Sequence, residues 1–185
     1  MQSDFADLTP KARRTRASLL DAGRRLYGLH GVAGVNVMSV CAEAGVGRTS
    51  FYNYFDDVEG LVGTLALDAA KDMKAKFDHL HSDQPRGRKR LRACLKMILT
   101  LAVEEPATAL LVTSLAQSSP EVGDLLSTEI HAELSAESDL SIEDVQGLTE
   151  FLSIATFALT RELAEGNPTG VCVDRYMEIL WRCVP

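Results

Sequence analysis

The chain has 185 residues, a formal net charge of −7 and 46% hydrophobic residues. This length is enough for one or two domains with a real core, and the ordinary composition excludes a disordered or fibrous protein. No apolar run approaches the roughly 20 residues of a membrane span, and the first segment, MQSDFADLTPKARR, lacks the apolar core of a signal peptide. We therefore expect a cytoplasmic, globular protein without a membrane partner.

Charge is distributed unevenly along the chain. Residues 1–55 contain seven Lys or Arg and four Asp or Glu, a net charge of +3, so the remainder must carry −10 to give the total of −7. Salt screens electric fields beyond about 8–10 Å, so a basic amino-terminal part can attract phosphate although the whole chain is acidic. A nucleic-acid partner is therefore compatible with this composition.

No constellation of residues indicates catalysis or metal binding. His79 and His81 are too close together to share a helix face, and the sequence has no Gly-rich phosphate loop or nucleophile–base motif. We expect no enzyme, no catalytic residue, no metal site and no cofactor. The cysteines lack CxxC spacing, which favours reduced thiols, and a redox-sensing role stays open for two of them. The four are Cys41, Cys94, Cys172 and Cys183.

The first predicted helix covers about residues 10–30, where apolar residues recur at helical spacing, and Gly31 ends it. Two short helices follow in residues 37–55. Asn36 can cap the first of them, and Gly45 fits a left-handed position at its end. Gly47 would be a weak cap for the second helix, and Phe51 and Phe55, four residues apart, would anchor it.

The second short helix carries polar and aromatic side chains that suit duplex DNA. Arginine can contact guanine, asparagine can pair with adenine, and tyrosine hydroxyls usually reach phosphates. Thr15 and Arg16 of the first helix, with the preceding Lys11, Arg13 and Arg14, could contact backbone phosphate, although a flexible basic arm would explain them equally well. The sequence thus predicts a helix-turn-helix. The predicted DNA contacts are Thr15, Arg16, Arg48, Thr49, Ser50, Tyr52, Asn53 and Tyr54.

These segments resemble the TetR family of bacterial transcriptional regulators over roughly residues 10–65. The shared runs include LLDAG at 19–23, AEAGVG at 42–47 and FYNYF at 51–55. The resemblance implies a divergent ligand-binding and dimerisation domain in the rest of the chain. Three positions depart from the family pattern. Gly47 stands where the family has a serine cap, and Thr49 stands where it has a glycine or alanine. Val58 stands where it has a phosphate-binding lysine.

The remaining chain reads as further helices, and about nine helices in total give an all-α fold class. A long fourth helix follows Asp56 and Asp57, with an apolar stripe that extends to Leu80. Ser119-Pro120 predicts a helix that has Ser119 as its N-cap and Pro120 as its first residue. Ser141 with Asp144 resembles a capping box at the start of another helix. We place a helix-turn-helix domain at residues 1–56 and a helical regulatory and dimerisation domain at residues 57–185.

The last two predicted helices carry a second apolar row beside their core-facing stripes. A helix that is apolar on two faces must bury both of them. Surplus core would explain the row in a single domain, whereas the family resemblance implies a four-helix dimer interface. The candidate interface residues are Phe151, Ile154, Ile179 and Trp181, with Phe157 beside them.

A ligand pocket is predicted less directly, from polar residues on the apolar helix faces of the second domain. Each of these residues is also explained as plain core. The candidates are Met97, Thr100, Leu101, Thr108, Leu111, Leu115, Gln117, Thr156 and Phe157. Arg161 and His131 could contact a polar ligand group, although surface ion pairing explains them as well.

The functional hypothesis is a homodimeric transcriptional regulator that binds a palindromic operator in double-stranded DNA. It would be a repressor released by a small-molecule effector. The alternative is a helical dimeric module that binds a small molecule or a protein and has lost specific DNA reading, which the departures at Gly47 and Val58 motivate.

Overall fold

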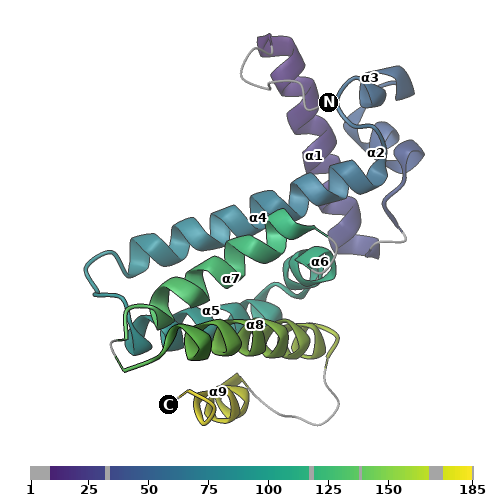
Figure 1. Cartoon of the computed structure of the whole chain (residues 1–185). Helices are drawn as coiled ribbons and strands as arrows, with labels where there is room; N and C mark the ends of the chain where they lie inside the picture. The colour runs from purple at the N-terminus through teal and green to yellow at the C-terminus, as the bar shows by residue number, and fades with distance from the viewer. Residues whose placement is uncertain (1–8, 32–33, 117–118, 138, 167–172, 185) are drawn as a thin grey trace. The chain divides into compact units, whose positions relative to one another are not determined.

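The computed structural model describes residues 9–31, 34–116, 119–137, 139–166 and 173–184, and all regular elements in these ranges are helices. The nine helices described confirm the all-α prediction (Figure 1). They are α1 (Pro10–His30), α2 (Val37–Ala44), α3 (Arg48–Tyr52), α4 (Val58–Leu80), α5 (Arg88–Glu104), α6 (Pro106–Ala116), α7 (Pro120–Leu134), α8 (Ile142–Ala164) and α9 (Val173–Trp181).

The chain divides into two compact units, Met1–Leu65 and Ala66–Pro185. The division falls inside α4, so this one helix contributes to both units. In the first unit α1 contacts α2, and α2 contacts α3. Gly23 of α1 is buried, and a Cβ added there would lie 2.6 Å from Leu61 Cδ2, so a glycine allows α1 and the first turns of α4 to approach closely.

The second unit is built around α5 and α8. Helix α8 contacts α5, α6 and α7, while α9 packs mainly against α5. Their apolar faces form one core, as the helical spacing in the sequence predicts. Its buried members are Leu91, Leu95, Leu99, Ile130, Leu134, Val145, Leu152, Tyr176, Met177 and Leu180.

The helix ends show where local sequence rules hold. Ser141 and Asp144 form the predicted capping box of α8, whereas Ser119 makes no side-chain cap bond at the start of α7. The prediction for Leu80 is wrong, because this residue is 68% exposed. It lies in the last turn of α4, where the helix ends and the apolar stripe no longer meets the core.

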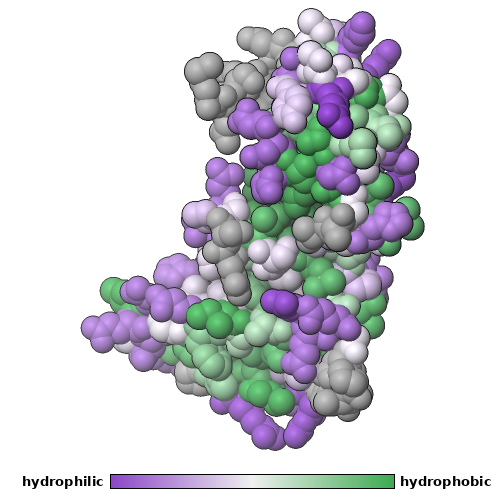
Figure 2. Space-filling model, turned by 90° about the vertical axis from the view of Figure 1, so that its right-hand side faces the viewer, coloured by the Kyte–Doolittle hydropathy of each residue, from purple (hydrophilic) through white to green (hydrophobic). Residues whose placement is uncertain are grey.

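Apolar side chains also reach the surface in several places, as the green areas among purple ones show on the face in Figure 2. None of the helices in the described ranges is long and apolar enough to cross a membrane. Within the same ranges, no group of three or more His, Cys, Asp or Glu residues could hold a metal ion.

Candidate nucleic-acid interface and regulatory site

The corner between α2 and α3 is fixed by backbone hydrogen bonds that local sequence provides. Asn36 Oδ1 accepts the N–H of Ser39 at 2.9 Å, and Ser39 Oγ accepts the N–H of Asn36 at 3.1 Å. Gly45 has φ 67° and ψ 32°, the left-handed conformation that side chains with a Cβ disfavour. Gly47 caps α3 without a side-chain hydrogen bond. The predicted cap, turn and weak cap are all confirmed.

Helix α3 is held by one fully buried side chain and presents its other side chains outward. Phe51 is 0% exposed and packs against Phe55, with ring centroids 5.7 Å apart. The rings of Tyr52 and Phe51 pack edge to face with their centroids 5.5 Å apart, and Tyr52 is 56% exposed. The rest of the predicted reading surface is exposed at Arg48, Thr49 and Asn53 and half-buried at Ser50 and Tyr54.

The predicted phosphate contacts on α1 are half-buried. Thr15 Oγ1 donates to the carbonyl of Lys11 at 3.1 Å, so its hydroxyl proton is used inside the helix. The Arg16 guanidinium lies over the Phe55 ring, 5.6 Å from its centroid. This contact joins α1 to Phe55, which follows α3. The sequence did not predict this role for Arg16.

Basic charge in this unit is only partly neutralised. Arg24 pairs with Asp21 and Arg25 pairs with Glu43. Among the residues that the structure describes, four other cations form no ion pair and are exposed, so they remain able to attract phosphate. These are Lys11, Arg13, Arg14 and Arg48.

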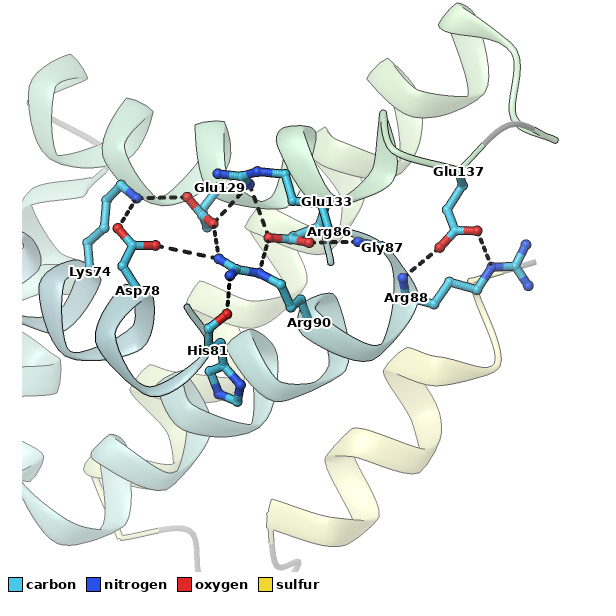
Figure 3. A network of polar contacts seen from close by, with 10 residues as sticks. All are labelled: Lys74, Asp78, His81, Arg86, Gly87, Arg88, Arg90, Glu129, Glu133 and Glu137. Atoms are coloured by element: carbon cyan, nitrogen blue, oxygen red, sulfur yellow. Dashed lines mark hydrogen bonds and ion pairs between the residues drawn. The ribbon is translucent and has the colours of Figure 1, made fainter. Parts of the chain in front are cut away.

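In the second unit, a buried network of charges joins α4, α5 and α7 (Figure 3). Arg90 Nε donates to Glu133 Oε1 at 2.9 Å, and Arg90 Nη2 donates to Glu129 Oε1 at 3.3 Å. Arg86 Nη1 lies 3.1 Å from both glutamates. The N–H of Gly87 donates to Glu133 Oε2 at 2.8 Å. Glu133 is 0% exposed, so each of its oxygens needs these partners.

The α4 end of this network is more open. Lys74 Nζ donates to Glu129 Oε2 at 2.9 Å and to Asp78 Oδ2 at 2.7 Å. Burial lowers the pKa of Lys74, but its hydrogen bonds to Asp78 and Glu129 outweigh burial, and the pKa lies above its ordinary value. Burial likewise raises the pKa of Glu129, yet the hydrogen bond and charge of Lys74, with Arg86, bring it below the ordinary value. Both groups are therefore charged near neutral pH.

A cavity of about 20 Å³ lies beside Lys74 and Glu129. It has room for about one water molecule. Burial raises the pKa of the Cys94 thiol to about 12, so this wall residue is a neutral, unreactive group. Apart from Lys74 and Glu129, the residues that line the cavity have apolar or thiol side chains. They are Met73, Phe77, Cys94, Met97, Ile98, Leu125 and Leu126.

Sequence reasoning did not find this network. Arg90 lies among the basic residues at the start of α5, yet it is only 6% exposed. A usable signal was present in α7, where Glu129 and Glu133 are four residues apart on the same face as Leu126 and Ile130. Two acids on a buried helix face require cations opposite them.

Of the predicted pocket residues, Met97 lines the cavity beside Lys74. Leu111 and Thr156 are buried elsewhere, and Gln117 lies outside the described residues. Phe157 lines a separate surface hollow of about 430 Å³ between α7 and α8. Half-buried positions are occupied by Thr100, Leu101, Thr108 and Leu115.

The predicted interface residues differ in exposure. Phe151, Ile154 and Ile179 are 47%, 70% and 45% exposed. Trp181 is half-buried against the core, and Arg92 lies over its ring at 5.2 Å from the centroid. These three residues of the second apolar row thus keep about half or more of their surface exposed, whereas its tryptophan is half-buried.

Fold and site together define a helix-turn-helix protein with a second helical unit. Residues 19–65 match the family model of "Bacterial regulatory proteins, tetR family". This part of the chain therefore belongs to the TetR family, and the whole chain has the fold of the transcriptional regulators of that family.

Solved structures support this assignment of the fold. A TetR-family transcriptional regulator from Pectobacterium atrosepticum is 18% identical, with a TM-score of 0.75 and coverage of 96% of each chain. FadR from Bacillus subtilis in complex with stearoyl-CoA is 13% identical, with a TM-score of 0.72 and coverage of 91% of this chain and 99% of FadR. RolR in complex with resorcinol is 21% identical, with a TM-score of 0.71 and coverage of 95% and 97%. A comparison with curated proteins finds no match in sequence.

Proposed function

We propose that this protein is a homodimeric transcriptional regulator that binds an operator through α3 and is released from it by a small-molecule ligand. The observation that carries the proposal is the exposure of Arg48, Thr49, Tyr52 and Asn53 on a helix anchored by buried Phe51. Such side chains can reach base edges and phosphates when a recognition helix lies in the major groove. Residues 1–56 would form the DNA-binding domain and residues 57–185 the regulatory domain.

The dimer would form through the second apolar row of α8 and α9. Exposed Phe151, Ile154 and Ile179 need a partner surface, and a two-fold axis would pair this face with itself. Two reading heads would then lie about 34–36 Å apart or a multiple of this distance, so the operator would be palindromic.

Ligand control would act in the second unit. Proteins of this fold have been solved with stearoyl-CoA and with resorcinol, so the fold accommodates ligands of different chemistry. An effector that binds the DNA-incompetent state more tightly would shift the equilibrium away from the operator and relieve repression.

The test uses a labelled DNA duplex from the region upstream of the protein's own gene. Fluorescence anisotropy of this duplex measures how tightly the protein binds it. We expect a preference for one palindromic segment over a scrambled duplex that persists at about 150 mM salt. A metabolite panel added to the complex should contain a compound that releases the protein. Equal binding of operator and scrambled duplexes at every salt concentration would contradict the proposal.

A second candidate function is a dimeric binding module without specific DNA reading. It is favoured by the uncapped start of α3 at Gly47 and by Val58 at the start of α4. The same titration separates the two functions. A module that only retains electrostatic attraction would lose its DNA binding steeply with salt and show no sequence preference.

A further inference from the structure

A surface hollow of about 430 Å³ lies between α7 and α8, which pack against each other (Figure 1). Among the described residues it shares no lining residue with the cavity beside Lys74. Gly123, Ser127 and His131 recur at four-residue spacing on α7, so they face the hollow together, and the first two are too small to fill it. The volume is within the range of about 300–1,000 Å³ in which proteins bind small molecules.

The hollow has a polar end and an apolar end. His131 Nδ1 and Thr149 Oγ1 lie 3.5 Å apart across the two helices and mark the polar end. Ile154 and Phe157 supply the apolar side chains of the lining. Phe157 is eight residues further along α8 than Thr149, which corresponds to about 12 Å of helix. A molecule that fills the hollow must therefore have a polar group and an apolar group at opposite ends.

Hydrogen-bond acceptors predominate in the hollow. Thr149 Oγ1 and Ser127 Oγ each donate to the backbone carbonyl four residues earlier, at 2.7 and 3.1 Å, so both oxygens face a ligand as acceptors. Glu150 adds a carboxylate, and Gln146 adds an amide. The described lining residues include no Lys or Arg, so an anionic group would find no counter-charge. The polar group of a ligand must therefore carry several donors and no negative charge.

A buried hydroxyl at the hollow lacks a partner within the described chain. Ser153 lines the hollow and is 7% exposed, and its Oγ makes no hydrogen bond to any described residue. A buried hydroxyl without a partner costs free energy. Rotation about χ1 between staggered positions can present this Oγ to a bound molecule. A hydroxyl of the ligand would then supply the missing hydrogen bond.

Hydroxyl groups match the polar end better than an ammonium group does. Hydroxyls both donate and accept, so several on one ring can meet Thr149, Ser153 and Gln146 together. An ammonium group would depend on Glu150, which is exposed, and an exposed ion pair contributes little. We infer that the hollow binds a neutral, polyhydroxylated ring that carries an aromatic group, the chemistry of an aryl glycoside. The hydroxyls lie at Ser153 and Glu150, and the aromatic group packs on Phe157.

The apolar end of the hollow borders the proposed dimer face, because Ile154 belongs to both. A molecule seated against Ile154 competes with a partner subunit for this side chain. A saturating ligand should therefore weaken dimerisation, since the two equilibria are linked. This consequence rests on the proposed function, whereas the site itself does not.

The experiment uses the full chain without DNA and isothermal titration calorimetry. The probes are the α and β anomers of phenyl glucoside and phenyl galactoside, with phenyl glucuronide as the anionic analogue and glucose as the analogue without an aromatic group. We expect at least one neutral glycoside to bind, and the glucuronide and glucose to bind at least about tenfold more weakly. Failure of all four glycosides at millimolar concentration, or preferential binding of the glucuronide, overturns the inference.

Two variants locate the site, each with a matched control on α8. Ser153→Ala removes the hydroxyl without a partner and should weaken glycoside binding about three- to tenfold. Its control is Thr160→Val, because Thr160 Oγ1 is also buried without a partner among the described residues but does not line the hollow. Glu150→Gln should weaken binding about fivefold or more, because hydrogen bonds to a carboxylate are stronger. Its control is Glu143→Gln, in the exposed first turn of the helix.

Because Glu150 is exposed, Glu150→Gln keeps the inference falsifiable even if Ser153→Ala fails to fold. Unchanged glycoside binding in Glu150→Gln overturns the inference, as do equal losses in Ser153→Ala and Thr160→Val. Sedimentation velocity, measured separately, reports on the proposed dimer. Glycoside binding by a chain that stays monomeric contradicts only the dimer, and a dimer that binds no glycoside contradicts only this site.

Discussion

The two units of this protein keep their candidate functional residues in opposite environments. In the first unit the important side chains are exposed on α3, and only Phe51 beneath them is in the core. In the second unit the notable charges, Arg90, Glu129 and Glu133, are buried and depend on partners 39 and 43 residues away in the chain. The comparison teaches that surface chemistry on a short helix can vary without affecting folding, whereas buried chemistry is part of the fold.

The largest effect is expected from a substitution of the most buried acidic residue. Glu133→Ala would leave Arg90 Nε and the N–H of Gly87 without their acceptor inside the second unit. We expect a loss of about 3–5 kcal/mol in the free energy of unfolding, measured by urea denaturation followed by circular dichroism. Glu143→Ala, in the exposed first turn of α8, is the control and should change stability by at most about 0.5 kcal/mol.

The proposed dimer face offers the next largest effect. Ile154→Asp places a charge in the exposed apolar row of α8 and should weaken dimerisation about 30-fold or more, because hot-spot residues contribute about 2 kcal/mol or more. Sedimentation velocity over a concentration range would measure this change. Ile142→Asp is a matched control, because Ile142 is 87% exposed on the same helix but lies outside the apolar row. If both variants remained equally dimeric, the interface would have to lie elsewhere.

The reading surface should tolerate substitution without loss of fold. Arg48→Ala should weaken operator binding by about 1–3 kcal/mol and leave the unfolding transition in place, since Arg48 is exposed. Fluorescence anisotropy and thermal unfolding of the same preparation give both values. Arg175→Ala, an exposed residue of α9, controls for loss of a positive charge. A destabilised Arg48→Ala would show that α3 is not independent of the core.

The smallest predicted effect concerns two helix caps. Asn36→Ala removes the side-chain oxygen that accepts the N–H of Ser39 in the α2 capping box and should cost about 1 kcal/mol of stability. Ser119→Ala should cost almost nothing, because Ser119 makes no side-chain cap bond at α7. Thermal unfolding of the two variants side by side would check the difference. Equal losses of stability in the two variants would mean that the substitutions act on the unfolded chain and not on the side-chain hydrogen bonds of the caps.

Local rules explain why the first unit could be predicted in detail. The cap at Asn36, the left-handed Gly45 and the anchor Phe51 each depend on residues within a few positions in the chain, and all three occur in the structure. The core faces of α8 and α9 were also predictable, because burial follows the helical period.

Prediction stopped where contacts join distant segments. Nothing near Arg90 in the sequence indicates that its partners are Glu129 and Glu133, so the burial of this arginine could not be predicted. The same limit applies to the cavity. Of its lining residues only Met97 was predicted, because the others come from three helices whose packing no local pattern specifies.

The arrangement of α3 has a consequence for how proteins of this kind diversify. Phe51 is the buried side chain of α3, while Arg48, Thr49 and Asn53 are exposed, so substitutions at these three positions should cost little stability and, under the proposed function, would change the preferred DNA site. Under the proposed function, one copy of a duplicated gene would acquire new target promoters through a few surface substitutions while its second unit stays unchanged.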